Sequence, residues 1–120
     1  MLFDTTQLAL ERAMEGAAMR QTALANNLAN ANTPGYQRVD VDFHSALRGA
    51  MESSDDPRAA VEHTTFAAQR DAMAATRADG SSVDAESEAS KLAANALEHQ
   101  AAVQVAHARI MILRSAMGVA

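Results

Sequence analysis

The chain has 120 residues, a net charge of −5 and no cysteine. This length suffices for one small domain, and the lack of cysteine excludes disulfide and thiolate chemistry. The single lysine and the absence of clustered arginines argue against nucleic acid or an anionic membrane as a partner. Much of the 48% hydrophobic share is alanine, with no tryptophan, and this composition favours closely packed helices.

The N-terminal segment predicts a helix from about 5 to about 31. Asp4 is placed to cap it, and Gln7 lies three residues on, as in a capping box. Phe3 and Leu8 have the spacing of a hydrophobic staple. Within the helix, residues spaced alternately four and three apart form a seam like that of a coiled coil. The seam residues are Leu10, Met14, Ala17, Gln21, Leu24, Leu28 and Ala31.

A sharp helix end is expected after residue 31. Asn30 and Asn32 tolerate left-handed backbone, Thr33 precedes a proline, and Pro34-Gly35 is a turn dipeptide.

The middle segment, residues 36–83, has the weakest pattern. Residues 36–41 alternate as in a short strand, and Asp42 could cap a short helix over 43–51. A loop is expected at 53–57 and a turn at 78–82, while residues 61–77 show no clean period, although their alanines make a marginal helix possible.

The C-terminal segment predicts a second long helix, from about 85 to about 117. Asp84 can cap it, and Glu86 and Glu88 suit the positive end of its dipole. A second seam of alternating three- and four-residue spacing runs along it. Its residues are Ala89, Leu92, Ala96, His99, Val103, Ala106, Ile110, Leu113 and Met117.

These elements predict an all-α fold in which two long terminal helices pack as an antiparallel, coiled-coil-like pair. The irregular middle segment would contain a weak strand and a short helix. The chain would divide into 1–35, 36–83 and 84–120. If Phe3 lies opposite Met117, Gln21 lies opposite His99, and we expect a Gln–His contact to set the register.

Apolar side chains also occur away from the seams. A helix that is apolar on more than one face needs more than one neighbour, and little else in 120 residues can cover them. We therefore expect the terminal helices to complete their core in an assembly. The off-seam residues are Met19, Leu97, Val105, Met111 and Ile112.

A decapeptide at the end of the first helix, NLANANTPGY, closely resembles the signature of bacterial flagellar axial proteins. The sequences QRVDVDF, DGSSVD, KLAANALEHQAAVQ and ARIMILRSAMG are similar to proteins of the proximal rod. The resemblance covers about 1–50 and 79–118. The signature residues include Asn27, Leu28, Asn30, Asn32, Thr33, Pro34, Gly35 and Tyr36.

The resemblance implies a structural subunit of the proximal rod of the basal body. Its terminal helices would pack into the inner core of a tube. Its partners would be other rod subunits and the membrane-ring and export-gate junction. The subunit would reach the periplasmic rod through the flagellar type III apparatus without a cleaved signal peptide. The N-terminus indeed lacks a basic region followed by an apolar core, and no apolar stretch is long enough to insert in a membrane.

Two interpretations of the signature asparagines remain open. Their amides could cap the end of their own helix, or they could bond backbone groups of adjoining subunits. For the whole chain, the alternative to a rod subunit is a small helical adaptor or export chaperone. We expect no enzyme, cofactor or metal site. The carboxylate pairs Asp55–Asp56 and Glu86–Glu88 suit a loop and a helix start, and His99 with His107 provides too few ligands.

Overall fold

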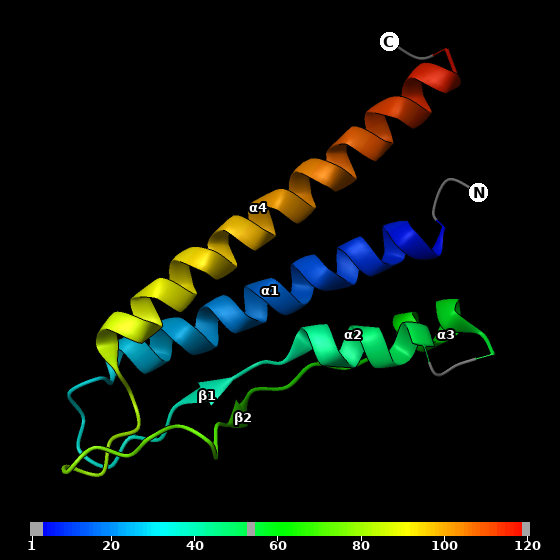
Figure 1. The fold of residues 1–120 in the computed structure, drawn as a ribbon. Coiled ribbons are helices and arrows are strands. Elements are labelled where there is room, and N and C mark those ends of the chain that lie inside the picture. The colour runs from blue at the N-terminus through cyan, green and yellow to red at the C-terminus, as the bar shows by residue number, and fades with distance from the viewer. Residues whose placement is uncertain (1–3, 53–54, 119–120) are drawn as a thin grey trace.

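A computed structural model describes residues 4–52 and 55–118 of the chain. It confirms the mostly helical fold with two long terminal helices packed together (Figure 1). The elements in chain order are α1 (Thr5–Ala29), β1 (Val39–Asp40), α2 (Phe43–Glu52), α3 (Pro57–His63), β2 (Gln69–Arg70) and α4 (Ala85–Ala116). Helices α1 and α4 run antiparallel, so the start of α1 and the end of α4 lie at the same end of the molecule.

Helix α1 begins where the sequence predicts. The Asp4 carboxylate accepts a hydrogen bond from the Gln7 N–H at 2.9 Å. The Gln7 side chain does not complete the capping box, because its Oε1 accepts from Arg109 of α4 at 3.3 Å. Phe3 of the expected staple lies outside the described residues. The helix ends at Ala29, two residues early, because the Asn30 N–H makes the last helical bonds as the C-cap.

The middle segment folds into an arm that lies along α1. Strands β1 and β2 pair antiparallel, with Val39 opposite Arg70, so the weak strand pattern marks a real but very short strand. Helix α2 follows Asp42, which accepts from the Ser45 N–H at 3.2 Å. Helix α3 was not predicted, because its seven residues are too few to show a period. Its signals are local, with Asp56 capping the Ala59 N–H at 3.1 Å.

The arm supplies much of the hydrophobic core. Phe43 is 1% exposed and packs with Leu47 and Val61 against Ala17 of α1. Gly16 makes this approach possible, because a Cβ atom there would lie 2.5 Å from the Phe43 side chain. The arm therefore covers a second side of α1, although Met19, the off-seam apolar residue of this helix, remains 36% exposed. That helix is flanked by α4 on one side and by the arm on the other (Figure 1).

Candidate assembly surfaces

The signature segment leads α1 into a tightly bonded junction with β1. The Asn27 side chain is fully buried. Its Nδ2 donates to the Val39 carbonyl at 2.6 Å, and its Oδ1 accepts from the Val39 N–H at 3.0 Å. The amide therefore bonds Val39 much as a neighbouring strand would. Asn27 Nδ2 also lies 3.3 Å from Glu88 Oε2 on α4, and the Tyr36 hydroxyl donates to Asn27 Oδ1 at 3.4 Å.

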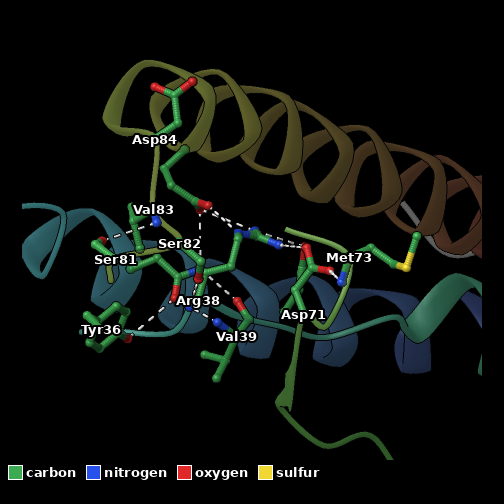
Figure 2. Close-up of polar contacts among 12 residues, drawn as sticks. Tyr36, Arg38, Val39, Asp71, Met73, Ser81, Ser82, Val83 and Asp84 are labelled. Atoms are coloured by element: carbon green, nitrogen blue, oxygen red, sulfur yellow. Dashed lines mark hydrogen bonds and ion pairs between the residues drawn. The ribbon is translucent and has the colours of Figure 1, made fainter. Parts of the chain in front are cut away.

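Arg38 is the centre of a buried charge network at this junction (Figure 2). Arg38 and Glu88 are 3% and 1% exposed, and the Arg38 Nε donates to the Glu88 carboxylate. Arg38 Nη1 donates to Asp71 at 2.6 Å, and Nη2 donates to Asp40 at 3.3 Å. One guanidinium thus joins three segments that are distant in the sequence: β1, the residue after β2, and the first turn of α4.

The network shifts the protonation of its acids. The hydrogen bond from Arg38 holds the pKa of Asp71 below its ordinary value of 3.8. Burial acts to raise the pKa of Asp40, but hydrogen bonds from Arg20 and the Val41 N–H outweigh it, so this pKa is also lowered. Arg20 reaches Asp40 from α1 at 2.8 Å. Both carboxyls are therefore ionised at neutral pH, as ion pairing with arginine requires.

Backbone contacts close the same junction. The Ser82 hydroxyl accepts from the Arg38 N–H at 2.8 Å, and the Ser82 N–H donates to the Tyr36 carbonyl at 2.9 Å. The Gly35 N–H donates to the Asp79 carbonyl at 3.0 Å. Gly35 and Gly80 both have positive φ, and a Cβ on Gly80 would lie 3.3 Å from the Gly35 Cα. The turn before α4 is thus held directly on the signature.

The signature residues therefore divide into two groups. The Asn27 amide makes its hydrogen bonds within its own chain, and a bond from this residue to an adjoining subunit stays a prediction. The Asn30 amide donates to the Asn26 carbonyl at 2.8 Å, which is a cap on its own helix. Leu28 and Tyr36 are half-buried. The exposed members are Asn32, Thr33, Pro34 and Gly35.

Between α1 and α4, polar side chains set the register. Asn95 is buried, and its Nδ2 donates to the Ala17 carbonyl and to Gln21 Oε1, both at 2.8 Å. The partner of Gln21 is thus Asn95, one helical turn before the predicted His99. Arg109 shows the same displacement, because it meets Gln7 and binds Asp4 at 2.8 Å. The predicted Gln–His contact is therefore replaced, and the register moves by one turn.

The predicted seam residues differ in burial along the helix pair. Leu24 is completely buried, whereas Val103, Ile110 and Met117 are 43%, 42% and 56% exposed. The other seam residues larger than alanine are half-buried: Leu10, Met14, Gln21, Leu28, Leu92, His99 and Leu113. The seam is covered best near the junction and least toward the end of α4.

Sequence reasoning missed the residues that hold the junction. Glu88 was assigned to the helix dipole, yet it is buried against Arg38. Arg38 was seen only as one position of a strand-like alternation. Asn95 precedes the predicted seam residue Ala96, so periodicity gave it no role. The signal available in the sequence was a polar residue beside the apolar seam of α4, namely Glu88 or Asn95. The partner of such a residue could not be predicted, because it lies far away along the chain.

Residues 4–52 and 55–118 contain no group of three or more histidine and carboxylate side chains able to hold a metal ion. Across the same residues, none of the helices combines the length and apolar character that a bilayer crossing needs.

The sequence of this chain is similar to those of known proteins. A family model described as "Flagella basal body rod protein" matches residues 8–37. The flagellar basal body rod protein FlgB of Aeromonas hydrophila is 31% identical over 114 residues, covering 88% of this chain and 86% of the relative. FlgB of Escherichia coli K12 is 35% identical, covering 75% and 76%. FlgB of Bacillus subtilis 168 is 25% identical, covering 97% and 95%. The chain therefore belongs to the FlgB family of structural flagellar basal body rod proteins.

Proposed function

We propose that this structural subunit of the proximal rod joins its neighbours through its terminal helices, with α4 making the larger share of the contacts. The observation that carries the proposal is the exposure of apolar side chains over the outer half of α4. This region, residues 99–116, is named the α4 tail. The large apolar side chains exposed on it are Val103, Val105, Ile110, Met111 and Ile112, with exposures from 42% to 68%.

Exposure on this scale is costly for a helix in water. Burial of apolar surface contributes roughly 25 cal/mol per Å², and contiguous exposed apolar surface typically marks an interaction site. Neighbours in sequence, such as Met111 and Ile112, point in different directions around the helix. More than one face of the α4 tail is therefore available to a partner, as a helix inside a multi-helix tube requires.

The division of the chain supports separate roles for its parts. Segments 1–35 and 84–120 would form the assembly core, while 36–83 would form an arm that fixes α1 from its other side. The partners would be other rod subunits and the membrane-ring and export-gate junction. The family suggests export through the flagellar type III apparatus without a cleaved signal peptide.

The test replaces two exposed residues of the α4 tail, Val105→Gln and Ile112→Gln, in one variant. Glutamine keeps high helix propensity, and both side chains are at least half exposed, so thermal unfolding should be unchanged. We expect the variant to be exported but to yield few basal-body rods and little motility. Met73→Gln, at a residue 93% exposed on the arm, is the matched control. Normal rod numbers in the double variant would overturn the proposal.

A further inference from the structure

Arg77 lies in the turn that leads the arm into α4. Two backbone hydrogen bonds close this turn, because the Arg77 N–H donates to the Ser81 carbonyl at 2.7 Å and the Gly80 N–H donates to the Arg77 carbonyl at 2.9 Å. The Gln37 side chain also donates to the Gly80 carbonyl, at 2.8 Å. The backbone of Arg77 is therefore fixed beside the signature, and its side chain extends from a defined point.

One nitrogen of this side chain bonds the ends of both long helices. Arg77 Nη1 donates to the Ala31 carbonyl at 3.1 Å and to the Val83 carbonyl at 3.5 Å. Ala31 directly follows the C-cap of α1, and Val83 directly precedes the N-cap of α4. Both residues are buried. A cation is also favourable at the end of α1, because the C-terminus is the negative end of a helix dipole.

The other contacts of α4 make its direction sensitive to its starting point. The helix begins at Ala85, and Asn95 bonds α1 ten residues later. Near its end, the ion pair between Arg109 and Asp4 is partly exposed, so it adds little restraint. With Asn95 as a pivot, about 15 Å of helix lies before it and about 25 Å lies between it and Ile112. A displacement at the start of α4 is therefore enlarged in the tail.

We infer that Arg77 is a positioning residue that aims the α4 tail relative to α1. It acts through the Ala31 and Val83 carbonyls, whose separation it fixes where the two helices meet. The inference rests on the proposed function, in which the tail contacts neighbours, and it adds the residue that sets the direction of the tail. Because a single nitrogen makes both bonds, a lysine at this position can supply the same donor, whereas a methionine cannot.

The distance between two spin labels in the folded, full-length chain tests this inference. The natural chain has no cysteine, so the labels can be attached through Glu11→Cys on α1 and Ser115→Cys on the α4 tail, both at exposed residues. We expect Arg77→Met to shift the mean distance by about 2 Å or more, since a movement of about 1 Å at the start of α4 is enlarged beyond the pivot. Arg77→Lys should retain the natural distance.

Two controls separate this role from other contributions of Arg77. Arg77 also forms a 3.6 Å ion pair with Asp79. Asp79→Asn removes that ion pair but keeps an oxygen to accept from the Ser81 N–H, so the label distance should not change. Arg70→Met removes an exposed arginine of β2 and should also leave it unchanged. A variant that only lost stability would keep the natural distance in its folded molecules.

The outcomes separate this inference from the proposed function. An unchanged label distance in Arg77→Met would overturn the inference. An equal shift in Asp79→Asn would also overturn it, because the ion pair would then set the direction of α4. An equal shift in Arg77→Lys would remove the role of the two carbonyls. None of these results depends on assembly, whereas normal rod numbers in the Val105→Gln, Ile112→Gln variant would remove the proposed function.

Discussion

The two ends of the α1–α4 pair are built in opposite ways. At the junction end, the signature, β1 and the turn before α4 share buried hydrogen bonds and the Arg38–Glu88 ion pair. At the tail end, Arg109 and Asp4 form a partly exposed ion pair, and the large apolar side chains around them remain in contact with water. The same two helices are thus closed at one end and open at the other.

This difference assigns separate tasks to the two ends. Buried ion pairs are costly to form, but removing one partner is more costly still, so the junction has one defined geometry. Exposed ion pairs add little stability, so the tail end depends on partners for its burial. A rod subunit needs both properties, because the fixed end aims the helices that the open end offers to neighbours.

The largest expected effect comes from breaking the junction at Arg38. The Arg38→Met variant leaves Glu88 buried without its cation, which should reduce the free energy of unfolding by about 3–5 kcal/mol. Urea unfolding followed by circular dichroism measures this. Arg70→Met, at an exposed residue of β2, should change stability by less than about 0.5 kcal/mol.

A double variant sharpens this prediction. Arg38→Met combined with Glu88→Leu removes both buried charges and should recover most of the lost stability. A loss below about 1 kcal/mol in Arg38→Met alone would show that the ion pair does not hold the junction.

Next in size is the amide of Asn27. Asn27→Ala leaves the Val39 N–H and carbonyl without their partner, which should cost about 2–4 kcal/mol. Asn32→Ala, at an exposed signature residue, should be nearly neutral in the same unfolding measurement. If the two variants unfolded alike, Asn27 would have no special role in joining α1 to β1.

A smaller effect is expected where the arm meets α1. Gly16→Ala forces the Phe43 side chain to move, which should cost about 1–2 kcal/mol. Gly49→Ala is the matched control, because a Cβ there meets nothing within 4 Å. In that control the higher helix propensity of alanine should raise stability by about 0.5–1 kcal/mol. Thermal unfolding distinguishes the two signs, and stabilisation by both variants would show that the packing of Phe43 is not tight.

The smallest expected effect is on the dependence of stability on acidic pH. The pKa of Asp71 is lowered in the folded chain by the hydrogen bond from Arg38. The ionised Asp71 carboxylate therefore contributes its full stabilisation when the pH is above the pKa of this group in the unfolded chain, about 3.8. The stabilisation is lost as the pH falls from there through the lower pKa of the folded chain. Asp71→Asn should be less stable at neutral pH and should lose less stability on acidification. A curve parallel to that of the natural chain would contradict this assignment.

Much of the fold could be predicted from local patterns. The starts of α1 and α4 follow from Asp4 and Asp84, whose carboxylates bond nearby backbone N–H groups. The start of α2 follows from Asp42 in the same way. Such signals lie within a few residues of the structure that they specify, so reading them requires no knowledge of distant contacts.

The candidate site was predictable only in part. The excess of apolar residues on the α4 tail was visible as off-seam positions such as Val105 and Ile112. The pairing of Arg38 with Glu88 was not visible, because it joins residues fifty positions apart. The register of the helix pair was likewise misplaced by one turn, because Asn95 and Arg109 selected it through polar contacts that periodicity ignores.

The sequence by itself determined where the long helices run and that their apolar surface exceeds one seam, since caps and periodicity are local properties. Only the tertiary structure decided which surface is satisfied within one copy. The arm covers α1 because Gly16 admits Phe43, whereas no described segment comparably covers the α4 tail. That outcome depends on shape and on contacts between distant residues, which a linear pattern does not contain.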